Sequence, residues 1–554
     1  MNAERQSHPS SSRPRLSLQG WLLGAALLGG CSGMIYREGR SHLFDEMPEA
    51  KPGPAMLFAY DDFRGLSTDT LNTTAVPWKL TATALVLDRY PSEAPTQAHL
   101  RELMQSFGFV YPDRIVNGGL MPDNGLRPPL GLVAGQVHSG FPRMQLEVAN
   151  IGCASCHGGR LYDAEGRPTD EVWLGLPNSS LDLDAYADAV VRSLSALDED
   201  PQPVLDAMRH LYPDVPAEEI ESLRRTVWPR LRKRLPELQA TGAVPFRNGG
   251  PGRSNGVEAM KFSLGIDGDG GVAAATGFPA LSSDLKLRSS LLVDGFYALP
   301  DTAKRFAPRQ RDAASTAVPL ANIAGFFVVS AMGVEPKRIP ELLPRTREIM
   351  AWLDETPTPV FPGPIDEPKA QRGAGLFADH CSSCHGQYVE TEGRPQLQRY
   401  PNKLVPMARI GTDPGRARAV TTEAVWHMQR SVLGDDLRPK AHDGYVAPSL
   451  SGIWATAPYL HNGSVPTLWH MMRPESRPRR FQVGGHALDY RTVGIAGQPD
   501  ARQDWHYPDG YRPWSTPQWL DTREAGNGNG GHERPFDELT EPQKDDLLEY
   551  LKRL

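Results

Sequence analysis

The sequence predicts a mainly helical protein with much irregular loop. Apolar residues recur at helical spacing in several stretches, most clearly in 217–238 and 540–554. Stretches that alternate apolar and polar residues are sparse and short, so we expect few strands. The chain also contains 53 glycines and 51 prolines, which favour turns and ordered loops.

The chain of 554 residues is too long for one ordinary core. Its length predicts roughly three or four domain-sized units. Its composition, 40% hydrophobic and 23% charged, is typical of a soluble globular protein. The formal net charge of −7 leaves no basic excess, so we expect no nucleic-acid partner.

Residues 1–30 predict a lipoprotein signal peptide. Arginines precede a short apolar stretch at 18–30, and Cys31 follows small residues as in a bacterial lipidation site. The stretch is too short and too glycine-rich for a confident membrane-spanning helix. An ordinary cleaved signal or an uncleaved anchor is the alternative. Because Ser32 rather than an aspartate follows the cysteine, we expect a periplasmic protein anchored to the outer membrane, with secretion as an alternative.

The elements along the chain follow from periodicity and from proline and glycine. Residues 81–87 predict a strand or a buried helical turn, and Pro229 is expected to kink or split the long amphipathic stretch. The glycine-rich loop at 248–256 lacks the Lys-Ser/Thr pair of a phosphate-binding loop. The expected helices are 97–107, 181–197, 217–238, 257–264, 339–353 and 540–554.

A proline-rich stretch at 356–364 predicts a boundary, because proline at this density cannot continue a helix. We expect five segments in chain order. They are the signal peptide (1–30), an N-terminal extension packed on the next domain (31–120), a first catalytic domain with insertions (121–355), a linker (356–368) and a second domain (369–554).

The motif C-x-x-C-H occurs twice, at 153–157 and 381–385. Cysteines three residues apart lie about one helical turn apart, so both sulfurs can bond to the vinyl groups of one haem. The adjoining histidine can then bind the iron. The residues are Cys153, Cys156 and His157 in the first copy and Cys381, Cys384 and His385 in the second. A zinc site made from all four cysteines is the alternative, and it leaves both histidines unexplained.

The cysteine count supports two covalently bound haems c, each with an iron. Four of the five cysteines belong to the two motifs, and Cys31 is the remaining one. No cysteine is therefore expected to be available for a disulfide.

The second axial ligand decides whether a haem iron reacts or only transfers electrons. For the second haem we favour His532, which follows a glycine-rich loop and precedes the terminal helix. Met407 is the alternative ligand, because a thioether is the other common partner of haem c. His461 and His470 are weaker candidates, and a hydrogen bond or packing explains each better.

For the first haem, no ligand is comparably placed. His138 lies 15 residues before Cys153, and His210 falls in a predicted helix. Neither has a supporting pattern, so we predict that the haem held by His157 is the open, reactive one.

Several stretches carry a family resemblance. Residues 370–385 and the terminal helix resemble parts of a class I cytochrome c fold. The stretch Gly452-Ile-Trp-Ala-Thr-Ala-Pro-Tyr-Leu-His-Asn-Gly-Ser-Val-Pro-Thr-Leu-Trp469 resembles the signature of the dihaem cytochrome c peroxidase superfamily. More narrowly, the chain is similar over about residues 115–554 to the rubber-oxygenase-like branch, which includes dihaem fatty-acid dioxygenases. The shorter matches are Gly131–Gly135, Gly250–Gly256, Ile410–Pro414 and Gly531–Glu533.

This resemblance implies two class I cytochrome c-like haem domains, the first enlarged by insertions. It also implies that His157 binds the reactive haem, where dioxygen binds, and that His385 and His532 bind the second. An aromatic residue is expected between the haems or over the reactive one. The candidates in this chain are Phe278, Phe296, Tyr297, Phe326, Phe327 and Trp454. The family leads us to expect a tryptophan in 276–297, where this chain has none.

Three functions compete on these observations. The first is a dioxygenase that adds dioxygen to an unsaturated lipid, such as an oleate-like fatty acid, or to polyisoprene. The second is a peroxidase that reduces hydrogen peroxide with electrons from a small donor protein, and it needs an acid–base pair that we do not identify. The third is a non-catalytic electron carrier. The extra mass around the first haem suggests a bulky substrate and favours the dioxygenase.

Overall fold

A computed structural model describes residues 36–38, 53–61, 76–120, 128–140, 143–242, 244–287, 291–292, 297–298, 339–430 and 440–554. Cys31, Phe296, Phe326 and Phe327 lie outside these residues. Within them, no helix combines the length and the apolar character that crossing a bilayer requires.

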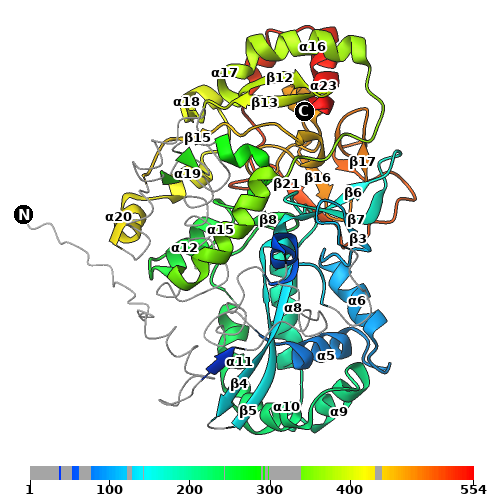
Figure 1. Cartoon of the computed structure of the whole chain (residues 1–554), viewed down its shortest axis with the longest axis vertical. Helices are drawn as coiled ribbons and strands as arrows, with labels where there is room; N and C mark the ends of the chain where they lie inside the picture. Colours follow the sequence, from blue (N-terminus) through cyan, green and yellow to red (C-terminus); the bar gives the residue numbers. More distant parts are fainter. Residues whose placement is uncertain are drawn as a thin grey trace, which may run out of the picture.

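A four-stranded sheet surrounded by helices forms the lower part of the molecule in Figure 1. Its strand order is β1-β4-β5-β2, and β4 and β5 pair along their whole length as an antiparallel hairpin. The elements are β1 (Tyr36–Glu38), β2 (Val76–Pro77), α5 (Trp78–Arg89), α6 (Gln97–Ser106), β4 (Leu132–Gly140), β5 (Arg143–Ile151), α8 (Leu183–Ser195), α9 (Gln202–Leu211), α10 (Ala217–Ser222) and α11 (Trp228–Thr241). One apolar cluster joins the sheet to these helices.

The helices of this part begin and bend where the sequence indicates. Thr96 caps α6 and Asp182 caps α8, each accepting a hydrogen bond from a backbone N–H three residues later. The stretch around Pro229 is divided just before this residue by a π-helical turn, η3 (Leu223–Val227), which joins α10 to α11. The ambiguous stretch 81–87 is helical and lies within α5.

The β4–β5 hairpin is longer than the sparse alternation led us to expect. The β5 side chains Leu146 and Val148 are buried on one face, and Glu147 is buried on the other. Lys79 pairs with Glu147 at 2.9 Å and with Glu219 at 2.6 Å. The polar face of the strand is therefore buried as well, because a lysine from α5 neutralises it.

Small sheets and helices form the middle of the molecule. A three-stranded sheet, in the order β3-β7-β6, follows the first motif directly, and Figure 1 shows it above the hairpin. The elements are α3 (Pro54–Met56), η1 (Leu57–Asp61), β3 (Arg114–Ile115), α7 (Cys153–His157), β6 (Gly158–Tyr162), β7 (Pro168–Leu174), β8 (Arg253–Ser254), α12 (Gly256–Ser263), β9 (Thr276–Gly277), η4 (Ser283–Leu287), β10 (Leu291–Leu292), β11 (Tyr297–Ala298) and α15 (Ile339–Glu355).

The upper part combines helices with hairpins and a four-stranded sheet of order β19-β20-β16-β21. The helices of this half of the chain are α16 (Glu367–His380), α17 (Ser382–His385), α18 (Met407–Ile410), α19 (Gly415–Ala419), α20 (Thr422–Arg430), η6 (Ile453–Ala455), α21 (Leu468–Met471), η7 (Pro474–Ser476), α22 (Glu533–Phe536) and α23 (Glu541–Arg553). Of these, α20 lies lower, near α12, and packs with the middle part. The strands of this half are β12 (Gln387–Thr391), β13 (Arg394–Arg399), β14 (Leu404–Pro406), β15 (Gly444–Val446), β16 (Arg480–Val483), β17 (Leu488–Asp489), β18 (Gly494–Ile495), β19 (Gln498–Pro499), β20 (Trp505–His506) and β21 (Gln518–Asp521).

The terminal helix α23 packs across α16, the helix that leads into the second motif (Figure 1). The rings of Phe377 and Tyr550 lie 5.4 Å apart at this crossing. Thr540 and Gln543 form a capping box at the start of α23. The crossing fixes the position of the second motif.

The proline-rich stretch has no regular secondary structure, and buried residues alternate with exposed ones along it. Phe361 is buried and contacts the rings of Trp454 at 5.5 Å and Tyr490 at 4.8 Å. The indole of Trp173 donates to the Pro357 carbonyl at 3.2 Å. The stretch thus contacts residues from both sides of the expected boundary.

Candidate haem sites

The first motif forms the short helix α7, which begins directly after β5. Asn178 holds this helix from outside, because its backbone N–H donates to the Cys156 carbonyl and its side-chain amide donates to the Ser155 carbonyl. Gly131 has φ of +76°, and a Cβ there would lie 1.8 Å from the Ser155 nitrogen. Only glycine permits this approach, which gives a physical reason for the glycine that begins the stretch 131–135.

The second motif follows α16 directly: Cys381 ends that helix, and residues 382–385 form α17. The backbone N–H groups of Cys384 and His385 both donate to the Cys381 carbonyl, so the motif is helical. All four motif cysteines are half-buried and free of disulfides. Three or more His, Cys, Asp or Glu side chains do not gather into an ion site anywhere in the described chain. This counts against the zinc alternative, which needs all four cysteines together.

Both motif histidines are held in the same way. His157 Nδ1 lies 3.0 Å from the Pro279 carbonyl, and His385 Nδ1 lies 2.8 Å from the Pro448 carbonyl. Burial lowers the pKa of His157 to about 4 and lowers the pKa of His385 as well, so both imidazoles are neutral at pH 7. A neutral imidazole that donates through Nδ1 leaves Nε2 as the metal-binding atom.

The structure brings His532 to His385. Their ring centres lie 6.3 Å apart with an interplanar angle of 32°. Two imidazoles that bind one iron from opposite sides, through bonds of about 2 Å, hold their ring centres about 6 Å apart. Among the described residues, Nδ1 of His532 is buried without a hydrogen-bond partner. Burial lowers the pKa of His532 to about 3, and this neutral pair fits the two axial positions of a haem iron.

The loop before His532 is fixed from several sides. Arg477 donates to the carbonyls of Asn529 and Gly531, and the His532 N–H donates to the Ile410 carbonyl at 3.0 Å. Gly531 has φ of +99°, and a Cβ there would lie 2.7 Å from the Thr412 nitrogen. The glycine-rich sequence therefore lets the chain lie against the end of α18.

Met407, the alternative ligand, begins α18 and is half-buried. His461 stacks on Tyr445 with ring centres 4.3 Å apart. His470 shares a hydrogen bond with the Thr467 hydroxyl at 2.8 Å. Packing and hydrogen bonding thus account for the two weaker histidine candidates, as the sequence indicates.

The candidates for the first site are placed unequally. The centres of the Phe278 and His157 rings lie 6.3 Å apart. Phe278 directly precedes Pro279, whose carbonyl contacts His157 Nδ1. Only the backbone of Tyr297 is described, in β11, and it pairs with Leu292. Trp454 is buried, and its indole donates to the Pro359 carbonyl at 3.3 Å, so it packs in the core of the second half.

The histidines considered for the first site do not gain support. His210 is exposed at the end of α9, and only the backbone of His138 is described, in β4. In the described part of the chain, His157 has Phe278 as its ring neighbour rather than a second imidazole.

A short two-stranded ladder connects the two candidate sites. Gly277 of β9 donates to the His461 carbonyl at 2.9 Å, and Phe278 donates to the Gly252 carbonyl at 3.0 Å. Arg253 of β8 pairs with Gly277 in this ladder. Its backbone therefore runs from beside His157 to His461, which lies near His532.

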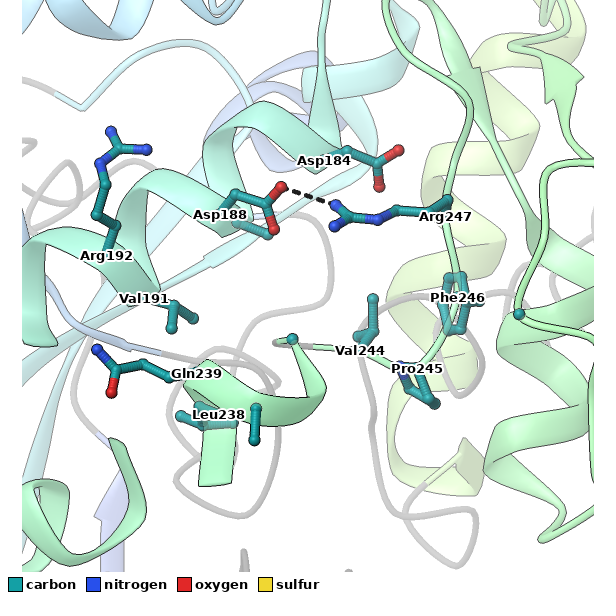
Figure 2. A pocket seen from close by; sticks show the side chains of 14 residues that line it. Asp184, Asp188, Val191, Arg192, Leu238, Gln239, Val244, Pro245, Phe246 and Arg247 are labelled. Atoms are coloured by element: carbon teal, nitrogen blue, oxygen red, sulfur yellow. Dashed lines mark hydrogen bonds and ion pairs between the residues drawn. The ribbon is translucent and has the colours of Figure 1, made fainter. Parts of the chain in front are cut away.

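A separate open cleft of about 650 Å³ lies between α8 and the end of α11 (Figure 2). Asp188 and Arg247 form an ion pair across it at 2.7 Å, and Asp184 accepts hydrogen bonds from the backbone N–H groups of residues 248 and 249. Its apolar residues, which include Val191, Leu238 and Phe246, alternate with these charges. A cleft lined by both charged and apolar residues differs from the apolar pocket that an alkene needs.

Sequence reasoning missed the Pro279 and Pro448 carbonyls and the ladder between the sites. A backbone acceptor leaves no side-chain signal, and strands of two residues are too short to alternate. The run at 250–256 did mark one edge of the ladder, as part of the family resemblance.

Comparison with known proteins identifies one matching domain family and two similar proteins. Residues 444–482 match the RoxA-like, cytochrome c-like domain family. Two uncharacterized proteins of Sinorhizobium fredii (strain NBRC 101917 / NGR234) are similar to this chain. One, y4iM, is 31% identical over 32% of this chain and 52% of its own length; the other, y4iJ, is 27% identical over 35% and 40%. The matched part of this chain thus spans about half the length of these relatives or less.

The matched segment includes β15, α21 and most of β16, and it contains the stretch 452–469. A cytochrome c-like domain implies covalently bound haem c, and the geometry around His385 and His532 fits such a group. The match at residues 444–482 shows that this segment is similar to the cytochrome c-like domain of the RoxA-like, rubber-oxygenase-like cytochromes.

Proposed function

We propose that this protein is a periplasmic dihaem c-type dioxygenase that adds dioxygen to an unsaturated lipid, such as an oleate-like fatty acid, or to polyisoprene. The domain match supports a haem-dependent oxidoreductase. The observation that carries the finer proposal is the difference between the two candidate sites. His385 faces a second imidazole, whereas His157 is accompanied in the described chain by Phe278.

This difference supports unequal roles for the two sites. A haem with two protein ligands mainly transfers electrons, and a haem with one can react with a small molecule. When bound, the haem supplies the redox chemistry; the chain's part is to hold it, to orient the substrate and to exclude water. The fixed Nδ1 contacts of His157 and His385 perform the first task.

The surroundings of the first motif suit an apolar substrate. Cys153 packs against one buried apolar cluster, which includes Leu130 and Val172, and Cys156 packs against another. The motif thus lies between two apolar cores, a setting that excludes water and accommodates an alkene better than a charged molecule.

The test is oxygen uptake without an added electron donor. Purified protein with two haems per chain should consume dioxygen with oleate or polyisoprene and yield an oxygenated product. Stearate, which has no double bond, is the matched control and should give no uptake. No uptake with any unsaturated substrate, together with fast peroxide reduction by a small electron donor, would instead support a peroxidase.

The N-terminal sequence supports a proposal for where the reaction takes place. We propose that residues 1–30 direct export and that a lipid on Cys31 anchors the protein at the outer membrane, near its lipid substrate. In cells grown with radiolabelled fatty acid, a Cys31→Ser variant should incorporate no label. It should also move from the membrane to the soluble periplasmic fraction. A variant that stays with the membrane would contradict the anchor.

A further inference from the structure

Arg253 is a buried cation with incomplete pairing. The residue is 3% exposed, and its Nη1 donates to the Gly249 carbonyl at 3.2 Å. In the described chain, its Nε and Nη2 atoms are buried without a hydrogen-bond partner. Leaving buried charged donors unpaired is costly, so folded proteins retain them where a ligand completes the pairing.

The acidic residues around Arg253 bind other groups. Asp184 accepts hydrogen bonds from Asn248 and Gly249, and Asp413 accepts them from the backbone N–H groups of residues 415 and 528. Burial lowers the pKa of Arg253 to about 10, and the nearby acids oppose this only in part. The guanidinium is therefore charged at pH 7, and none of the carboxylates in the described chain, Glu524 included, accepts a hydrogen bond from its Nε or Nη2.

The two unpaired donors lie on one edge of the guanidinium. Nε and Nη2 form the side-on fork that matches the two oxygens of a carboxylate. Arg372 uses the same two atoms on Asp546, at 2.8 Å from Nε and 2.6 Å from Nη2. Arg253 thus presents a complete carboxylate-binding edge.

The backbone of Arg253 lies in the ladder that connects the two candidate haem sites. Arg253 pairs in the β8–β9 ladder with Gly277, whose N–H donates to the His461 carbonyl. The next residue, Phe278, lies beside His157. Haem is the expected ligand on both sides of the ladder, and its free polar groups are two propionate carboxylates.

We propose that Arg253 binds a propionate carboxylate of one of the two haems through Nε and Nη2. The proposal rests on the dihaem content proposed above. It makes Arg253 a positioning residue that fixes one haem against the ladder and sets its reduction potential. A fixed positive charge near the iron stabilises the reduced form, so it raises the potential.

The experiment is a redox titration of the purified dihaem protein, with the two haems resolved by their spectra. Arg253→Gln should leave two covalent haems but lower the potential of one of them. The expected change is at least tenfold in that haem's reduction equilibrium constant, which is about 59 mV for a one-electron couple. The affected haem is identified by its spin state: a high-spin haem is the one held by His157, and a low-spin haem is the one held by His385.

Arg480→Gln is the matched control, because Arg480 already has a carboxylate partner in Asp504 at 2.6 Å. It should leave both potentials unchanged. Arg253→Lys keeps the charge but not the fork, so it should shift the same haem by less than Arg253→Gln. If Arg253→Gln does not accumulate, Arg253→Met, which also removes the charge, takes its place; two haems with wild-type potentials in that variant overturn the proposal.

Unchanged potentials in Arg253→Gln, or an equal shift in Arg480→Gln, would also overturn it. The result is separable from the proposed reaction. If Arg253→Gln lowers the potential of one haem but the wild-type protein consumes no oxygen, the dioxygenase is refuted and this assignment remains. Oxygen uptake with unchanged potentials refutes this assignment alone.

Discussion

His532 adopts a backbone conformation that few residues other than glycine adopt. Its φ of 62° places it in the left-handed region, at a cost of about 1 kcal/mol. The hydrogen bond from its N–H to Ile410 and the contacts of Arg477 with the preceding loop hold it there. Such strain is common where a side chain must be aimed at a ligand.

His532→Ala should convert the second haem from low-spin to high-spin. The substitution removes the imidazole that faces His385 at 6.3 Å and leaves one axial ligand. The absorption spectrum and electron paramagnetic resonance of the purified variant measure the change. Met407→Leu is the control and should keep the low-spin spectrum. The opposite pair of results would identify Met407 as the ligand.

A second residue-scale prediction concerns acid stability. His486 is 2% exposed, and burial lowers its pKa from 6.5 to about 4. The unfolded chain binds this proton more readily than the folded one, so the contribution of His486 to stability is full above pH 6.5 and falls as the pH approaches 4. Between pH 7 and pH 5 the loss is about 2 kcal/mol.

His486→Phe should therefore reduce the fall in the free energy of unfolding between pH 7 and pH 5 by about that amount. Urea unfolding at both pH values measures it. His210→Gln, at an exposed position, should show the wild-type difference. An unchanged pH dependence in His486→Phe would show that the ring is not the group that titrates.

At the scale of elements, the crossing of α16 and α23 depends on Gly373. A Cβ at this position would lie 2.1 Å from the Asp546 carbonyl oxygen and 2.9 Å from Cβ of Tyr550. Gly375 lies on the same helix and has no atom within 4 Å of the corresponding point. The two glycines thus separate the effect of close packing from that of helix propensity.

Gly373→Ala should push the helices apart and destabilise the second half by about 1–3 kcal/mol. Gly375→Ala should leave stability unchanged or raise it by up to about 1 kcal/mol, because alanine favours the helix. Thermal unfolding followed through the haem absorption of each variant tests this. Equal effects of the two substitutions would rule out the packing argument.

The elements show what the sequence could and could not predict. Helices such as α8 and α23 follow from apolar periodicity and caps, which are local. The length of the β4–β5 hairpin was not predicted, because the buried Glu147 does not show in the alternation of apolar and polar residues. The burial of Glu147 depends on Lys79, about 70 residues away in sequence. The motif residues were readable because the spacing itself carries the chemistry, whereas the Phe278–Gly277–His461 connection exists only after folding.

At the scale of the whole molecule, the two halves are joined by buried hydrogen bonds. Gly485 donates to the Ser180 hydroxyl at 2.9 Å, and the Tyr490 hydroxyl donates to the Asp163 carbonyl at 2.7 Å. Leu488 donates to the Gly166 carbonyl at 2.8 Å. Residues 485–490, which follow the second motif in the chain, therefore pack against the β6–β7 hairpin and the segment after it, which follow the first motif.

Heating should accordingly give one unfolding transition for both halves. Calorimetry combined with the haem absorption of each site would test it, with the two signals expected to change at the same temperature. Two separated transitions would show that the halves unfold independently in spite of these contacts. A Ser180→Ala variant should lower the common midpoint, since it leaves the buried Gly485 N–H unpaired.

These same contacts set the order of events when the chain folds. They join residues 305 and 327 positions apart, so loop closure is slow and the native contacts have high sequence separation. The segments that follow the first motif, at 163–166 and 180, therefore cannot gain these contacts until residues 485–490 are present. We therefore expect the chain just after Cys153 and Cys156 to pack completely only late in folding, which provides an interval for haem attachment at the two thiols.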